Sequence, residues 1–135
     1  MAGSKVAQKL AAGFGSVLLG SALGVNLNAT TNADTAVIPL IDTPTKFRIR
    51  AVAMTNGSIN PTTARFAINT GAANTGTAVV TSVTPSLASS ATVQDLSIAS
   101  TNAITGTGNL YVYLTTAQGA AATVDLYIYG DIYTA

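Results

Sequence analysis

The chain contains no histidine, cysteine, tryptophan or glutamate among its 135 residues, and only 8% of these residues are charged. A typical soluble protein has about 25% charged residues, so the surface of this one must consist largely of threonine, serine, asparagine, glycine and alanine. The absence of cysteine excludes disulfides and thiol chemistry, and it leaves the redox compartment undecided.

The missing side chains also exclude most catalytic and metal sites. Without histidine or cysteine there can be no Ser–His–Asp triad, no cysteine nucleophile and no zinc site of the usual ligands. Asp125 and Asp131 are six positions apart, about 20 Å along an extended strand, which is too far for an acid–base pair. No glycine-rich stretch has the lysine and helix of a phosphate loop. We therefore expect neither an enzyme nor a cofactor. Asp34, Asn28 and Asn32 could supply oxygens to calcium, but turn chemistry explains them better.

Charge of either sign is scarce, and the net charge is +1. Such a chain has no long-range field that would attract nucleic acid or an anionic membrane. Low net charge also limits colloidal repulsion between free molecules. We expect a protein that works within an assembly and binds neither nucleic acid nor a membrane.

Threonine, valine, isoleucine and tyrosine are plentiful, which favours strands over helices. Seven or eight apolar or alternating segments follow one another at spacings of roughly 10–15 residues, with turn residues between them. The expected strands span residues 25–27, 36–41, 46–55, 62–69, 78–83, 93–98, 109–116 and 122–133. This pattern predicts an all-β domain, an antiparallel two-sheet β-sandwich of jelly-roll type. We expect hairpins between 46–55 and 62–69, and between 109–116 and 122–133.

Residues 1–24 differ from the rest of the chain. Lys5 and Lys9 precede a short run rich in Leu, Ala, Gly and Ser, which resembles a secretory leader and is too short and too polar for a membrane span. We interpret residues 1–24 as an N-terminal arm, with a short helix over 4–12, that docks on its own subunit or a neighbour. Residues 25–135 are then the sandwich domain.

The last segment, 122–133, alternates with period two. One face carries apolar residues, and the other carries Asp125, Tyr127, Tyr129, Asp131 and Tyr133. A face of tyrosine and aspartate suits a wet protein contact better than a core. Ordinary strand surface is the alternative.

Three of the six Lys and Arg residues, Lys46, Arg48 and Arg50, lie on one face of the segment 46–55. Phe47, Ile49 and Ala51 are expected on the buried face. The basic stripe could protect an edge strand from pairing, or it could meet the Asp125/Asp131 face of a neighbouring subunit. Nucleic-acid binding is the weakest reading, because no aromatic residues are interleaved with the charges.

Several segments together resemble small virion proteins of tailed bacteriophages. They are 47–56, 63–68, 93–98 and 110–131, and the most specific is Gly119-Ala-Ala-Ala-Thr-Val-Asp-Leu-Tyr-Ile-Tyr-Gly-Asp131. The resemblance covers roughly residues 35–135 and leaves residues 1–24 outside it. It implies a β-sandwich carried on the particle as a capsid cement or decoration protein, or as a head or tail accessory part.

The resemblance implies a capsid exterior location, with the major capsid protein or other virion proteins as partners. A homotrimer is favoured, because cement proteins commonly occupy three-fold positions. The nearest alternative is a phage tail, neck or fibre component. A secreted surface or pilus-like subunit would use residues 1–24 as a leader, and a carbohydrate-binding module would need more exposed aromatic residues than these tyrosines.

Overall fold

The structure is a computed structural model, and it describes residues 17–40, 46–86, 92–99, 104–105 and 108–134. These residues form nine β-strands and contain no helix. The strands are β1 (Val17–Asn26), β2 (Ala33–Pro39), β3 (Lys46–Thr55), β4 (Arg65–Gly71), β5 (Thr75–Val83), β6 (Val93–Leu96), β7 (Ile104–Thr105), β8 (Asn109–Thr116) and β9 (Thr123–Thr134). The all-β prediction is confirmed.

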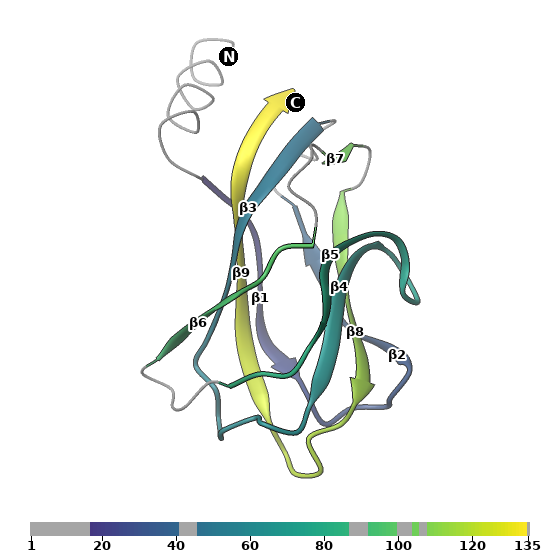
Figure 1. Ribbon diagram of the computed structural model, residues 1–135, viewed down its shortest axis with the longest axis vertical. Coiled ribbons are helices and arrows are strands. Elements are labelled where there is room, and N and C mark those ends of the chain that lie inside the picture. Colours follow the sequence, from purple (N-terminus) through teal and green to yellow (C-terminus); the bar gives the residue numbers. More distant parts are fainter. Residues whose placement is uncertain (1–16, 41–45, 87–91, 100–103, 106–107, 135) are drawn as a thin grey trace.

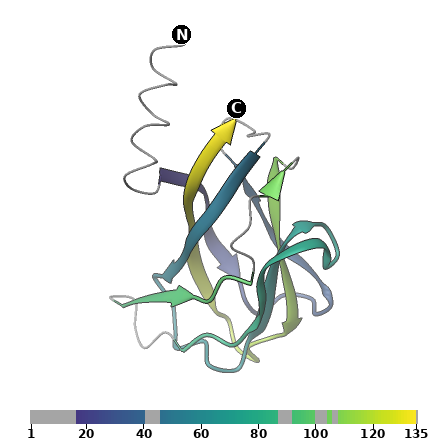
Figure 2. The same ribbon diagram turned by 45° about the horizontal axis from the view of Figure 1, so that its top comes forward.

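The strands form two antiparallel sheets that pack face to face (Figures 1 and 2). Sheet A has the order β1-β9-β3-β6, with the short β7 also paired to β3. Sheet B has the order β2-β8-β4-β5. The molecule is therefore a two-sheet β-sandwich, as the sequence predicted.

The winding of the chain is that of a jelly roll. Apart from β7, the strands pair in a nested series, in which β1 pairs with β9, β2 with β8, β3 with β6 and β4 with β5. The chain thus runs as one long doubled ribbon that wraps around the core, and this gives the two Greek keys of a jelly roll.

Both expected hairpins are wrong, and the jelly-roll winding explains why. Strands β8 and β9 follow each other in sequence but lie in opposite sheets, and so do β3 and β4. Each connection is an arch between the sheets, while hydrogen bonds join strands far apart in the chain. Within sheet B the true hairpin is β4–β5, whose turn holds Ala73 and Asn74 with positive φ.

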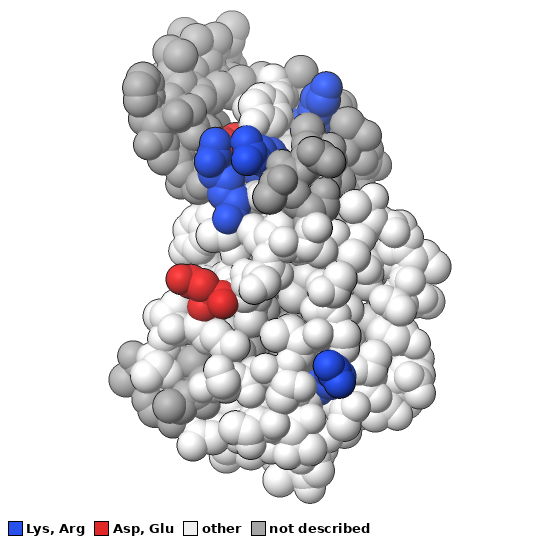
Figure 3. All heavy atoms as spheres, viewed as in Figure 1, with Lys and Arg blue, Asp and Glu red and all other residues white. Residues whose placement is uncertain are grey.

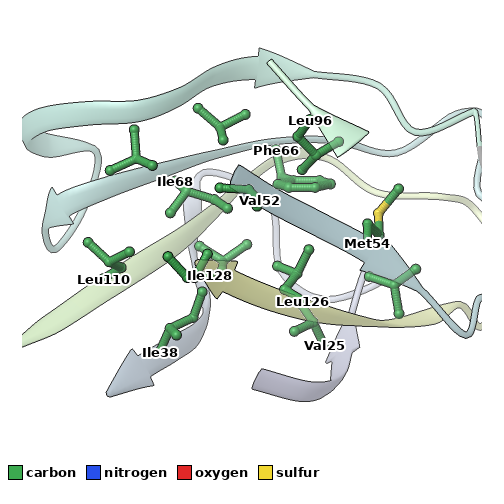
Figure 4. Packing of buried hydrophobic residues seen from close by; sticks show 14 of the residues in the cluster. Val25, Ile38, Val52, Met54, Phe66, Ile68, Leu96, Leu110, Leu126 and Ile128 are labelled. Carbon is green, nitrogen blue, oxygen red and sulfur yellow. The ribbon is translucent and has the colours of Figure 1, made fainter. Parts of the chain in front are cut away.

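The core lies between the sheets and is built by period-two alternation. Val124, Leu126 and Ile128 of β9 are fully buried, and Leu110 and Leu114 of β8 face them from sheet B. Figure 4 shows side chains from both sheets meeting in this layer. Each large apolar side chain buried here stabilises the fold by about 1.5–3 kcal/mol.

The expected boundary between arm and sandwich, at residue 24, falls inside strand β1. Val17–Asn26 pairs along β9, and the side chain of Leu19 is completely buried. The sandwich therefore begins at residue 17 or earlier. The expected helix over residues 4–12 lies outside the described residues.

A β-bulge changes the alternation in the middle of β3. Relative to β9, the strand has one extra residue, Arg50, between Ile49 and Ala51. The bulge shifts the following residues by one position, so Val52 is buried and Ala51 is only half-buried. The expectation that Ala51 faces the core is therefore wrong, because a bulge reverses the phase of the strand after it.

Gly130 allows β9 to approach β3 beside this bulge. A Cβ at Gly130 would overlap the carbonyl oxygen of Arg48 and would crowd Leu19. Only glycine leaves room for both neighbours.

Candidate functional site

The eight residues expected at an interface all lie on two adjacent strands of sheet A. Strand β3 carries Lys46, Arg48 and Arg50, and strand β9 carries Asp125, Tyr127, Tyr129, Asp131 and Tyr133. In the folded chain, the basic stripe and the tyrosine face therefore lie on adjacent strands of the same sheet. We call the outer surface of β3 and β9 the sheet A face.

One end of the sheet A face holds an ion pair within the chain. Arg48 lies directly opposite Asp131 in the β3–β9 register, and the Nε of Arg50 donates to Oδ2 of Asp131. The hydrogen bond first, and the charge of Asp131 second, raise the pKa of Arg50. The Arg50 side chain is 47% exposed and that of Asp131 only 7%. The acidic partner that we expected from a neighbouring subunit is thus supplied here by the same chain.

This end of the face also has unsatisfied polar atoms. Nε of Arg48 and Oδ1 of Asp131 are buried and have no hydrogen-bond partner within the described residues. A buried polar atom without a partner costs about 1–3 kcal/mol. Within the described part of the chain, one donor and one acceptor are therefore unsatisfied.

The other end of the face is organised by Asp125. Its carboxylate accepts a hydrogen bond from the N–H of Gly24 and another from the side-chain amide of Asn56, each 2.8 Å long. Gly24 and Asn56 both have positive φ; Gly24 lies at the register shift within β1, and Asn56 directly follows β3. Asp125 therefore stabilises two irregular points of its own chain.

Between the two ends, the face is nearly uncharged and partly aromatic. Tyr127 lies opposite Ala53, and Tyr129 opposite Ala51, in the β3–β9 register. Leu18 of β1 pairs with Tyr129 on its other side and is 41% exposed. Tyrosines with small neighbours offer apolar area and a polar tip together, which is typical of protein contacts.

The remaining two tyrosines point the other way, which we had not predicted. Tyr111 and Tyr113 belong to β8 and lie on the outer side of sheet B, opposite Asn69 and Ala67. The alternation in 109–116 indicates which residues face outward. It could not indicate that β8 and β9 belong to different sheets.

A groove beside β3 is a second feature that sequence reasoning missed. It has a volume of about 470 Å³ and runs along Arg48–Val52 and the segment from Asp95 to Ile98. In Figure 3 most of the Lys and Arg atoms gather toward the upper end of the molecule, one basic side chain lies apart in the lower half, and most of the remaining surface is uncharged. No local motif marks this groove, because it exists only where β6 turns away from β3.

Two of the three possible calcium ligands, Asp34 and Asn28, accept hydrogen bonds from backbone N–H groups of the same chain. Asp34 accepts a hydrogen bond from the N–H of Ala73, and Asn28 accepts one from the N–H of Gly119. Within the described residues, no three acidic, histidine or cysteine side chains are grouped to hold a metal ion. The same part of the chain has no helix of the length and apolarity that crossing a membrane requires.

Comparisons with known proteins add no relative to this description. No protein-family model, no curated protein and no solved structure shows a significant match to the chain. The sandwich and its sheet A face are therefore the basis for any functional conclusion.

Proposed function

We propose that this chain is a structural protein of a bacteriophage virion, a capsid cement protein that binds its neighbours through the sheet A face. The observation that carries the proposal is the gathering of the eight expected interface residues on two adjacent strands of one sheet. The resemblance of residues 35–135 to small phage virion proteins supplies the biological setting. Jelly rolls occur in viral capsid proteins, which is an analogy of fold only.

The chemistry of the face supports a role in binding. Its middle has the half-buried Tyr127 and Tyr129 and the exposed Leu18, with little charge to desolvate, and its charged groups lie at the two ends. Interfaces commonly have this arrangement of an apolar, aromatic centre and a polar rim. The chain acts, in this proposal, by contact alone and not by catalysis.

The proposed mechanism is mechanical. A cement subunit that contacts two neighbouring capsid subunits adds buried area across the seam between them, so separating them costs more free energy. Many such contacts on one shell act together, and modest individual affinities then give a large total effect. A trimer would present three sheet A faces at a three-fold position.

The direct test locates the polypeptide in purified particles by electron microscopy and measures its occupancy. We expect the double substitution of Tyr127→Lys and Tyr129→Lys to lower the occupancy at least about tenfold, since two charges would be desolvated at the contact. The matched control, Tyr111→Lys with Tyr113→Lys, places the same charges on sheet B and should leave occupancy unchanged.

Other outcomes would assign the chain elsewhere. Density for the chain at the neck, tail or fibres, with none on the shell, would replace cement by the accessory role. A polypeptide absent from particles would overturn the virion proposal. Equal loss in the two double variants would show that the sheet A face has no special part in binding.

A further inference from the structure

Asn56 and Gly57 form the only Asn-Gly step in the chain. Asparagine is a thermolabile residue, and it is most reactive before glycine, because glycine has no side chain to hinder attack by its backbone nitrogen on the asparagine carboxamide. The step lies directly after β3, where the chain enters the arch to β4. Asn56 is exposed, so water reaches it. The chain therefore has a site whose covalent structure can change without an enzyme or a cofactor.

The reaction at such a step is deamidation. The deprotonated backbone nitrogen of Gly57 attacks Cγ of Asn56, a C–N bond forms, and the side-chain nitrogen leaves as ammonia. The product is a five-membered succinimide ring. Water then adds to one of the two ring carbonyls and breaks its bond to the ring nitrogen, which gives aspartate or isoaspartate. The net change replaces an amide by a carboxylic acid, with water consumed and ammonia released, and it involves no oxidant or reductant.

In the folded chain the side chain of Asn56 is held by Asp125. Nδ2 of Asn56 donates to Oδ2 of Asp125 over 2.8 Å, and Asp125 lies on the neighbouring strand β9, opposite Thr55. The other oxygen of the same carboxylate accepts the N–H of Gly24, which fixes the carboxylate in turn. Hydrogen bonds to a charged acceptor are roughly twice as strong as those between neutral groups. The carboxamide of Asn56 is therefore held on the neighbouring strand and does not turn freely toward Gly57.

The backbone at this step is restrained as well. Asn56 has a φ of 56°, in the left-handed region that asparagine adopts more readily than most residues. Gly57 is buried, and the N–H of Ser58 donates to the carbonyl of Thr123 over 3.0 Å. Closure of the succinimide ring requires the torsions of Asn56 to rotate until the Gly57 nitrogen reaches Cγ, and it requires a base to reach that nitrogen. The fold opposes both.

We propose that Asn56-Gly57 is a deamidation site and that the hydrogen bond to Asp125 restrains the reaction in the folded chain. Loss of that bond releases the carboxamide, and Asn56 is then converted to aspartate or isoaspartate. Asp125 thus protects the neighbouring strand chemically, besides stabilising it.

The conversion weakens the end of the sheet A face that Asp125 organises. The new carboxylate has no donor for Asp125, and two neighbouring carboxylates repel each other. In isoaspartate the main chain is also one carbon longer, which displaces the start of the β3–β4 arch. The change is irreversible, so chains of different age differ at this end of the face. This inference does not depend on the proposed function, because it concerns the chemistry of the free chain.

The test follows residues 51–65 by mass spectrometry after the full chain has been incubated in mildly alkaline buffer. Trypsin cleaves after Arg50 and Arg65 and releases these residues as one peptide, which contains Asn56 and Asn60. Asn60 precedes a proline, whose nitrogen carries no proton for this reaction, so Asn60 is an internal control. The gain in mass from amide to acid, and the separate elution of the isoaspartate form, report reaction at Asn56. A short digestion at slightly acidic pH adds no product of its own.

The first comparison uses the unaltered protein. We expect Asn56 in the folded chain to deamidate at least about tenfold more slowly than in a synthetic peptide of residues 51–65. Asp125→Ala should raise the rate in the folded chain at least about threefold, because it releases the carboxamide and leaves residues 51–65 unchanged. Asp34→Ala is the matched control, since it removes a carboxylate contact of the same kind from sheet B. It should leave the rate unchanged.

A folded chain that reacts as fast as the peptide would overturn the proposal, and this comparison needs no variant. Equal acceleration in Asp125→Ala and Asp34→Ala would also overturn it, since general loosening of the fold would then set the rate. So would an Asp125→Ala chain that reacts as slowly as the parent. The deamidated fraction, separated by its additional negative charge, should unfold at a lower urea concentration than the parent; an unchanged midpoint would contradict the loss of the contact with Asp125.

Discussion

Each sheet presents tyrosines outward from a central strand, Tyr127, Tyr129 and Tyr133 from β9 in sheet A, and Tyr111 and Tyr113 from β8 in sheet B. Their surroundings differ. Among the described residues, sheet A carries Lys46, Arg48, Arg50, Asp95, Asp125 and Asp131, whereas sheet B carries Asp34 and Arg65. Two outer surfaces of similar strand type therefore differ mainly in charge.

The polar groups of sheet B are used within the hairpin β4–β5. The side-chain amide of the buried Asn69 donates to Asn74 in the turn, and Asp34 of β2 accepts from Ala73 in the same turn. In sheet A, by contrast, Arg48 and Asp131 each retain a buried polar atom without a partner among the described residues. Incomplete satisfaction of buried polar groups is uncommon in native proteins and often marks a functional site. The comparison therefore points to sheet A as the binding side.

The largest effect should come from the centre of sheet A. Gly130→Ala places a methyl group against the backbone carbonyl of Arg48, which cannot move without disturbing β3. We expect the free energy of unfolding to fall by at least about 3 kcal/mol, measured by urea denaturation. In sheet B, Gly71→Ala meets first the flexible side chain of Thr75 at a hairpin end and should cost less. Equal losses would contradict the view that β3 and β9 are packed more tightly.

The second-largest loss of stability should come from the contact between the two arches that connect the sheets. Oε1 of Gln118, in the β8–β9 arch, accepts the N–H groups of Thr63 and Ala64 in the β3–β4 arch, each at 2.9 Å. Ala64 is fully buried, so its N–H would have no replacement partner. Gln118→Ala should lower the free energy of unfolding by about 2 kcal/mol. Gln118→Glu keeps the acceptor and should recover most of that loss; an equally unstable Glu variant would show that the two bonds are unimportant.

A smaller difference should separate two aspartates. Asp125→Ala removes two hydrogen bonds from the sheet A side, and Asp34→Ala removes one from the sheet B side. These bonds are solvent-exposed, so we expect losses of about 1 kcal/mol for Asp125 and about half of that for Asp34 in thermal or urea unfolding. The reverse order would indicate that the hairpin of sheet B depends more strongly on its carboxylate. Asp125 and Asp131 both bond to other residues of the chain, so substitution of either one changes folding stability as well as any assembly contact.

The smallest effect on stability should follow from deletion of residues 2–16. The first strand and the buried Leu19 begin after this segment, so we expect the free energy of unfolding to change by less than about 0.5 kcal/mol. If residues 2–16 act as an assembly arm, oligomerisation or occupancy on particles should fall nonetheless. Unchanged assembly in sedimentation and on particles would remove the arm from the proposal. Deletion through residue 24 is not a comparable test, because it would remove most of β1.

The sequence predicted the positions of most strands, but it did not predict which strands pair. Alternation in 46–55, 109–116 and 122–133 located β3, β8 and β9 within one residue at each end. The first strand was expected over only 25–27, because the small residues before it resembled an arm. Half of the residues in 17–24 are glycine, alanine or serine, which do not favour a strand, and these residues form one through pairing with β9.

The sequence predicted which residues belong to the candidate site, but it did not predict how they are arranged. Outward positions of Tyr127 and Tyr129 follow directly from the buried residues between them. The pairing of Arg50 with Asp131 does not, since their separation in the chain hides the fact that β3 and β9 are neighbours. The bulge at Arg50 was also unforeseen, because nothing in a run of alternating residues marks the extra one.

The sequence by itself determined that this protein is all-β, which side of most strands is buried, and which catalytic and metal chemistries its residue types exclude. Side-chain polarity with a period of two carries that information locally. The tertiary structure decided which strands are neighbours, and that the acid opposite the basic stripe comes from the same chain. The backbone hydrogen-bonding groups are nearly identical in every strand, so they do not specify which strands pair. The pairing is fixed by the nested packing of the whole jelly roll.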